Sequence, residues 1–113
     1  RLGRKQIFKR SLSTGGGVIK KVYSGRSRDD IRHIALNIIR NPGYIVLFGL
    51  KTDRKANLIL ARSEDVDFDM RELIPAASQL INGKGGGRPS LVELAGDNVE
   101  NLNQILNELE SEF

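Results

Sequence analysis

A chain of 113 residues, 39% hydrophobic and 28% charged, is long enough for one packed domain and is neither disordered nor membrane-spanning in composition. Its longest apolar run, residues 44–50, is too short to cross a bilayer, and the first residues show no secretory signal pattern. The lack of cysteine excludes disulfides, a thiol nucleophile and a thiolate metal site, so we expect a cytoplasmic domain without a cofactor. Because the sequence starts at Arg1 and not at methionine, we expect residues 1–113 to be a single domain cut from a longer chain.

The formal net charge of +4 is distributed unevenly along the chain. Residues 1–40 hold eleven Lys and Arg against two Asp, whereas residues 41–113 hold seven Lys and Arg against twelve Asp and Glu. Clustered positive charge is typical of domains that bind polyanions such as nucleic acids. A solvated basic surface that pairs with the acidic C-terminal half explains the same pattern, so charge alone leaves both interpretations open.

The first elements predicted along the chain are two strands. Residues 6–12 and 18–23 are rich in β-branched and aromatic side chains, and the glycines of residues 15–17 separate them. This pattern predicts a hairpin or two neighbouring strands. Ser13 and Thr14, next to the glycines, could hold a phosphate, but a flexible turn is the commoner meaning of such a segment.

A helix and a second pair of strands follow. Ser27 or Asp29 is a suitable N-cap for a helix that runs to about Arg40 with its isoleucines on one face. Residues 44–50 (YIVLFGL) are almost continuously apolar, which predicts the central strand of a sheet, buried on both faces. Residues 57–62 (NLILAR) come after a polar turn and are predicted to be its antiparallel partner.

The apolar residues of 70–81 recur at helical spacing. Asp69 followed three residues later by Glu72 resembles a capping box at the start of this helix. Pro75 conflicts with a continuous helix because an interior proline removes a backbone hydrogen bond. We therefore expect a kink at Pro75 or a helix that begins near it.

The last third of the chain predicts a loop, a strand and a helix. Residues 83–89 are rich in glycine and predict a loop, residues 91–94 a short strand, and residues 99–109 a helix capped by Asp97 or Asn98. The order of all the elements predicts an α/β (α+β) fold, with a single mixed β-sheet of four or five strands covered by about three helices.

The most informative segment is residues 83–89 (GKGGGRP). Glycine permits positive φ angles and close approach, which leaves backbone N–H groups free to meet phosphate oxygens, and Lys84 and Arg88 supply positive charge. The alternative is a helix C-cap at Gly83 followed by a solvated loop. A P-loop and a dinucleotide fingerprint are both excluded, since each requires a strand before the glycines and a helix after them.

This string, placed after an amphipathic helix that ends in LING, resembles the C-terminal domain of alanyl-tRNA synthetases. The same domain type accompanies DHH phosphoesterases and RecJ-type nucleases. The resemblance extends over the strand pair, the first helix and the YIVLFGL and NLILAR strands. Arg88 and Pro89 favour the synthetase branch, because other members more often carry histidine after the glycines. Synthetases usually continue after this string with a small residue, then Ala-Gln-Ala and a pair of glycines. This sequence departs from that pattern and continues with residues 90–97 (SLVELAGD).

The resemblance implies a tRNA-binding domain of an alanine-tRNA ligase. Such a domain docks on the tRNA elbow and helps bring aminoacylation and editing modules to one tRNA. Its implied partners are tRNA, the other domains of the parent synthetase and, in some relatives, a second copy in a homodimer, with no membrane. The residues that inherit nucleic-acid contact by position are Lys84, Gly85, Gly86, Gly87 and Arg88. The uneven charge adds Lys9, Arg10, Lys20 and Lys21.

No catalytic site is predicted in this chain. His33 is the only histidine, so neither a zinc site nor a catalytic triad can be assembled around it, and we expect it on a solvated surface. The acidic residues Glu64, Asp65, Asp67 and Asp69 lack the spacing of a calcium loop and favour a solvated segment.

Two other functions stay open. One is the accessory nucleic-acid-binding domain of a DHH-type phosphoesterase or nuclease, whose metal ligands would lie before Arg1. The other is a dimerisation module with an incidental basic surface.

Overall fold

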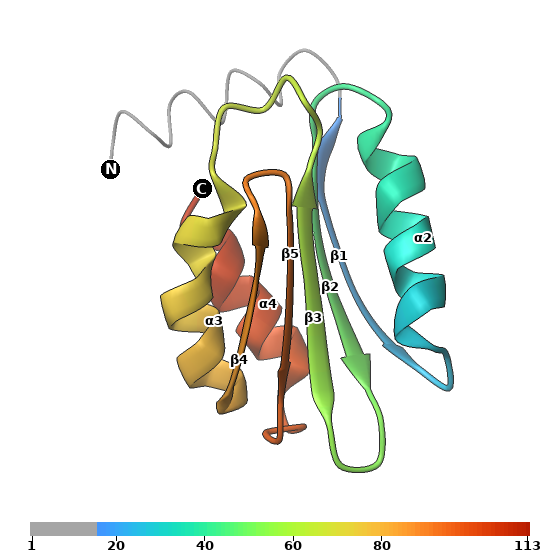
Figure 1. Cartoon of the computed structure of the whole chain (residues 1–113), viewed down its shortest axis with the longest axis vertical. Helices are drawn as coiled ribbons and strands as arrows, with labels where there is room; N and C mark the ends of the chain where they lie inside the picture. The colour runs from blue at the N-terminus through green and yellow to red at the C-terminus, as the bar shows by residue number, and fades with distance from the viewer. Residues whose placement is uncertain (1–15) are drawn as a thin grey trace.

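A mixed β-sheet lies between helices on both of its faces in residues 16–113, the part of the chain that the computed structural model describes. Figure 1 shows α2 on one face and α3 and α4 on the other. The strands are β1 (Gly17–Ser24), β2 (Tyr44–Lys51), β3 (Ala56–Arg62), β4 (Gly83–Arg88) and β5 (Leu91–Gly96). The helices are α2 (Arg28–Ile39), the short 3-10 helix η1 (Met70–Leu73), α3 (Ile74–Ile81) and α4 (Leu102–Glu110).

The order of the strands across the sheet is β1-β2-β3-β5-β4. β1 and β2 are parallel, and the other neighbouring strands are antiparallel. The predicted α/β fold with one mixed sheet is therefore confirmed. The prediction that residues 44–50 form the central strand is wrong by one place, because β5 pairs with the free edge of β3 and makes β3 the middle strand. β2 is still an interior strand, and its residues 45–48 are at most 1% exposed.

The sheet separates two hydrophobic cores. The larger core lies under η1, α3 and α4 and includes Leu47, Leu60 and Leu94. The smaller core lies under α2 and includes Ile31 and Phe48. Because α2 packs on β2 and β3, it leaves the same face of β5 and β4 without a helix.

Ser27 as the cap of α2 and a helix start near Pro75 are confirmed, whereas the expected capping box differs, since the Asp69 side chain accepts from the N–H of Arg71. The Ser27 side chain accepts a hydrogen bond of 3.1 Å from the backbone N–H of Asp30 and caps α2. Pro75 lies in the first turn of α3, where a missing N–H costs nothing, after Asp69 has capped η1 through the N–H of Arg71. The helix thus begins near the proline.

The expected cap of the last helix is wrong. α4 begins at Leu102 after Asn101, which has a left-handed φ of 59°. Asn98 instead donates a side-chain hydrogen bond of 2.8 Å to the carbonyl of Leu80, and Asp97 accepts one of 2.7 Å from the side chain of Asn82. Both residues join the end of β5 to the end of α3, a contact that no local pattern in the sequence indicates.

Some predictions fall outside the described residues, namely the strand of residues 6–12, the Ser13 and Thr14 alternative, and the contacts of Lys9 and Arg10. Within residues 16–113, no helix is long and apolar enough to cross a membrane.

Candidate nucleic-acid interface

The glycine-rich segment is a strand at the edge of the sheet, and the prediction of a loop is wrong. Asn82, with a left-handed φ of 52°, turns the chain out of α3, so the helix ends one residue before the expected cap at Gly83. Residues 83–88 then pair along their whole length with β5, from Gly83 opposite Gly96 to Arg88 opposite Leu91. Glycine has a low preference for strands, so only the pairing with β5 explains why this segment is extended.

The glycines of β4 have different structural roles. A Cβ added to Gly85 would lie 2.1 Å from the carbonyl oxygen of Glu93, and Gly83 and Gly87 show the same kind of collision with β5. A Cβ on Gly86 would meet nothing within 4 Å. Among the residues of β4 only Gly87 has a positive φ, and its value of 158° is close to that of extended backbone. The expected left-handed loop geometry is therefore absent from this strand. Close packing on β5 therefore explains three of the glycines but not Gly86.

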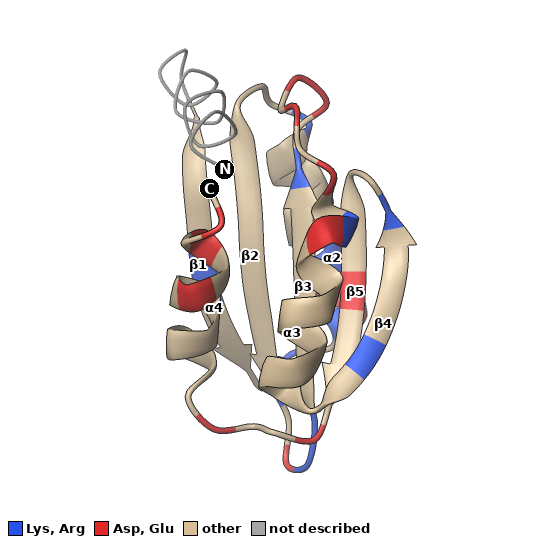
Figure 2. Cartoon of the chain, turned by 90° about the vertical axis from the view of Figure 1, so that its left-hand side faces the viewer, with Lys and Arg blue, Asp and Glu red and all other residues tan. Residues whose placement is uncertain are grey.

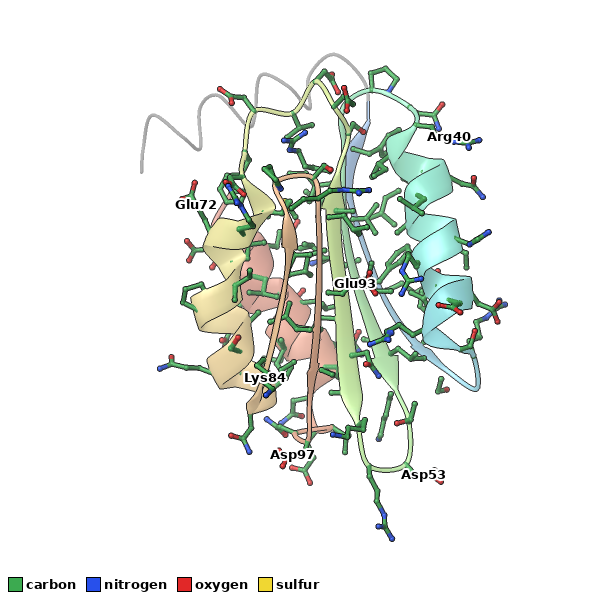
Figure 3. All side chains as sticks on the ribbon, in the orientation of Figure 1. Arg40, Asp53, Glu72, Lys84, Glu93 and Asp97 are labelled. Atoms are coloured by element: carbon green, nitrogen blue, oxygen red, sulfur yellow. The ribbon has the colours of Figure 1, made fainter. Side chains whose placement is uncertain are left out.

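Lys84 and Arg88 lie on the same face of β4, because every second residue of a strand points to the same side. That face is the one α2 leaves open, since Arg88 pairs with Leu91 of the smaller core. Both cations are exposed, and neither forms a hydrogen bond or ion pair with another described residue. Figure 2 shows positive charge near both ends of β4, and Figure 3 labels Lys84 near its start.

The turn after Arg88 is held from two sides. The carbonyl of Pro89 accepts a hydrogen bond of 2.9 Å from the N–H of Met70, and the carbonyl of Ser90 accepts one of 3.0 Å from the N–H of Arg62. These bonds attach the β4–β5 turn to η1 and to β3. Arg88 is consequently presented from an anchored turn.

Two hollows lie along the β4–β5 hairpin, the first of them between the hairpin and α2, and we call them together the α2–β4 trough. The first, of about 320 Å³, is lined by Leu36, Ile39, Arg40, Arg62, Glu64, Arg88 and Ser90. The second, of about 240 Å³, is lined by Gly86, Gly87, Arg88, Leu91 and Glu93. Arg88 lines both hollows, so the trough has a cation at its middle.

An ion pair that the sequence analysis missed connects α2 to β5 beside the trough. Arg32 donates to both carboxylate oxygens of Glu93, with Nε–Oε2 and Nη2–Oε1 distances of 2.9 and 3.0 Å. Arg28 lies 3.9 Å from the same carboxylate, and Asp29 accepts a further bond from Arg32. The hydrogen bond to Glu93 is the main cause that raises the pKa of Arg32. A single acid within the apolar stretch LVEL was the available signal. Figure 3 labels Glu93.

Lys20 and Lys21 lie on the opposite edge of the sheet and point to opposite faces. Lys20 Nζ is 2.5 Å from the carboxylate of Glu110 and donates a bond of 2.6 Å to Asn107, so α4 engages it. Lys21 Nζ lies 4.9 Å from the ring centroid of Tyr23. The structure does not bring these lysines together with Lys84 and Arg88, and their contact with nucleic acid stays a prediction.

The residues considered for catalysis or metal binding have other surroundings. His33 is exposed on α2. Asp65 accepts a bond of 2.9 Å from the N–H of Gly43, and Asp69 caps η1. In residues 16–113, no three histidines or carboxylates gather in a way that could hold a metal ion.

The fold and the trough define a three-layer α/β domain with an exposed basic edge strand. The DHHA1 domain family matches residues 15–113, and the chain belongs to this family. The expected relationship to the DHH-associated domains is confirmed.

Individual relatives carry the names of one kind of enzyme. The alanine-tRNA ligase of Leptospira interrogans serovar copenhageni is 22% identical over 107 residues, which cover 90% of this chain and 11% of that protein. The alanine-tRNA ligase of Levilactobacillus brevis is 42% identical over 60 residues, which cover 51% of this chain and 7% of that protein. The chain thus spans about a tenth of the length of these relatives.

A solved structure has the same fold. The C-Ala domain from Aquifex aeolicus alanyl-tRNA synthetase superposes with a TM-score of 0.75 at 18% identity, covering 83% of this chain and 87% of that domain. At this identity the match establishes the fold of the domain. The resemblance to the C-terminal domain of these synthetases is thereby confirmed.

Proposed function

We propose that this chain is the tRNA-binding C-terminal domain of an alanine-tRNA ligase. It docks on the elbow of tRNA through the α2–β4 trough and helps couple aminoacylation and editing in the parent protein. The names of the relatives and the fold of the C-Ala domain support the assignment to a synthetase. Other domains of the synthetase and tRNA are the partners that this function requires, and the cytoplasm is the compartment in which it operates.

The observation that carries the proposal is the pair of cations on β4 that have no partner within residues 16–113. Lys84 and Arg88 are separated by four residues of extended chain, which corresponds to about 13 Å at roughly 3.3 Å per residue. Both point to the open face of the sheet, and Gly86 between them carries no side chain. Phosphate groups on a nucleic-acid strand can therefore reach both cations without an obstruction between them.

The rest of the trough supports a polyanion as the ligand. Arg40 and Arg62 line it together with Arg88 and one carboxylate, Glu64. The other acid, Glu93, is paired with Arg32 and lies near Arg28. Arg62 donates to the carbonyls of Phe68 and Ser63, so its guanidinium is held by the segment that follows β3. The lining of the trough therefore holds more cations than carboxylates, although the C-terminal half of the chain is acidic.

The test compares Arg88→Ala with Arg54→Ala in the full chain by titration against folded tRNA and against a linear RNA strand of equal length. Each variant loses one charge, but Arg54 lies in the turn between β2 and β3, away from the trough. We expect Arg88→Ala to weaken tRNA binding about tenfold and to lower the salt slope by about one unit, and Arg54→Ala to change affinity less than about twofold.

Equal losses for the two variants on both ligands would contradict the proposal. Salt-independent binding, or none at low salt, would favour a dimerisation module with an incidental basic surface. Sedimentation of the same samples measures the oligomeric state directly.

A further inference from the structure

The outer edge of β4 offers backbone groups for pairing with a further strand. Within residues 16–113, β4 is the last strand on its side of the sheet and pairs with β5 alone. Figure 2 shows α3 and α4 in front of the sheet and no described element beyond β4. Apart from the ladder with β5, residues 83–88 form no backbone hydrogen bond with another described residue. Because successive residues of a strand direct their N–H and C=O groups to opposite sides, every second residue of β4 presents both groups outward.

β4 lacks most of the features that protect an edge strand from a partner strand. Protected edge strands are commonly very short, bent by a bulge or interrupted by proline. β4 keeps an unbroken register with β5 over all six residues and contains no proline. Charge is the protective feature that it has, because Lys84 and Arg88 stand on one face. Charge repels some partners and attracts others, so it determines which strand can pair here.

The two cations disfavour a second copy of this chain as the added strand. Antiparallel pairing of two β4 strands centred on Gly86 would place Lys84 of each copy directly opposite Arg88 of the other. Like charges directly opposite each other on neighbouring strands are destabilising. An incoming strand with carboxylates at these two positions would instead form two cross-strand ion pairs, with cations that have no partner among the described residues.

Gly86, between the two cations, favours an aromatic residue at the middle of the incoming strand. A Cβ at Gly86 would meet nothing within 4 Å, and the hollow of about 240 Å³ that Leu91 also lines lies beside it. An aromatic side chain on a neighbouring strand can lie across a glycine at a sheet edge and cover its backbone. Leu91, a residue of the smaller core, would give such a ring an apolar contact.

We propose that β4 docks an extended protein segment that adds a strand to the sheet, with acidic side chains opposite Lys84 and Arg88 and an aromatic side chain opposite Gly86. The segment has the order acid, any residue, aromatic, any residue, acid. Backbone hydrogen bonds along the edge supply affinity, and the alternate side chains supply specificity. The inference goes beyond RNA binding. Because both ligands need Lys84 and Arg88, a docked segment excludes RNA from the trough.

The test uses a capped nine-residue peptide of threonines with glutamate at its third and seventh positions and phenylalanine at its fifth, titrated against the full chain. Replacing both glutamates with glutamine should weaken binding about tenfold, and replacing phenylalanine with alanine about fivefold. A chain that binds none of these peptides, or that binds the glutamate and glutamine peptides equally, would overturn the inference.

Methylation of the peptide nitrogens tests strand addition itself. Methyl groups on alternate residues block the N–H groups on only one side of an extended strand. We expect methylation of one alternate set of residues to abolish binding, and methylation of the other set to change the affinity by less than about threefold. Equal losses from both sets would show that the peptide is held by charge without pairing with β4, and would overturn the inference.

A charge exchange identifies the surface that binds the peptide. Lys84→Glu with Arg88→Glu should lose the glutamate peptide and bind a peptide with lysine at its third and seventh positions. Lys51→Glu with Arg54→Glu makes the same change of net charge at exposed residues near the β2–β3 turn, and it should alter either affinity by less than about threefold. Similar effects of the two double variants, at unchanged urea midpoints, would place the peptide elsewhere and overturn the inference.

The peptide is titrated without RNA, so the inference and the proposed function fail separately. Absence of peptide binding would overturn the inference and leave tRNA binding through the trough intact. Saturating tRNA should weaken peptide binding at least about tenfold, because the two ligands share Lys84 and Arg88. A peptide that passes the charge exchange and yet is not displaced by tRNA would support the inference and contradict the proposed function.

Discussion

The two edges of the sheet carry similar charge and present it differently. On β1, Lys20 is paired with Glu110 and Lys21 lies over an aromatic ring. On β4, Lys84 and Arg88 have no partner among the described residues and share one face. In the sequence, the two strands look alike, because each is a short segment that contains two cations.

The placement of the helices causes this difference. α4 packs against β1 and brings a carboxylate to Lys20, whereas α2 packs on β2 and β3 and stops short of β4. The alternation of side chains along a strand then separates the adjacent Lys20 and Lys21 and aligns Lys84 with Arg88. Whether a cation is available to a ligand therefore depends on the residues that pack against it and not on the local density of basic residues.

The largest expected effect concerns the pairing of β4 with β5. Gly85→Val should lower the free energy of unfolding by about 2 kcal/mol or more, because its Cβ would meet the backbone of β5 at 2.1 Å. Gly86→Val should change it by less than about 0.5 kcal/mol, since its Cβ has open space. Urea unfolding measures both variants. Equal destabilisation would show that β4 is held differently from the structure described.

The contrast between the edges is tested by two double variants that each lose two charges. Lys84→Ala with Arg88→Ala should weaken tRNA binding roughly hundredfold and lower the salt slope by about two units. Lys20→Ala with Lys21→Ala should weaken it by less than about threefold, because these cations lie on opposite faces of the other edge. Similar losses for the two double variants would mean that net charge, and not the trough, determines affinity.

A smaller effect is expected from filling the trough without changing charge. Gly86→Val should weaken tRNA binding about tenfold at an unchanged urea midpoint, because a branched side chain would occupy the space between Lys84 and Arg88. Titration at fixed salt measures the loss, and the salt slope should stay as in the unsubstituted chain. Unchanged affinity would place the RNA elsewhere on the domain.

The smallest effect is expected at the β1 edge. Glu110→Gln releases Lys20 from its ion pair, and the loss of stability should not exceed about 0.5 kcal/mol, because both side chains are about a third exposed and exposed pairs contribute little. The affinity for tRNA should rise by less than about twofold. A larger rise would show that the freed Lys20 contacts RNA and would bring β1 into the interface.

The sequence alone determined the elements whose signals are local. The β-branched run of β1, the Ser27 cap of α2, the apolar β2 and the proline at the start of α3 all depend on neighbours in the chain. The fold class and the family resemblance followed from their order and from the string GKGGGRP. The same string contains Lys84 and Arg88, the two cations of the candidate site.

Only the tertiary structure decided the form and the surroundings of the candidate site. Residues 83–88 become a strand because β5 pairs with them. Glycine has a low strand preference, so the sequence of this segment does not predict a strand. The ion pair of Arg32 with Glu93 joins residues 61 positions apart, and the pairing of Lys20 with Glu110 likewise joins opposite ends of the domain. Such contacts arise from strand register and helix placement, which are non-local, so a local pattern shows which cations exist but not which of them stay free.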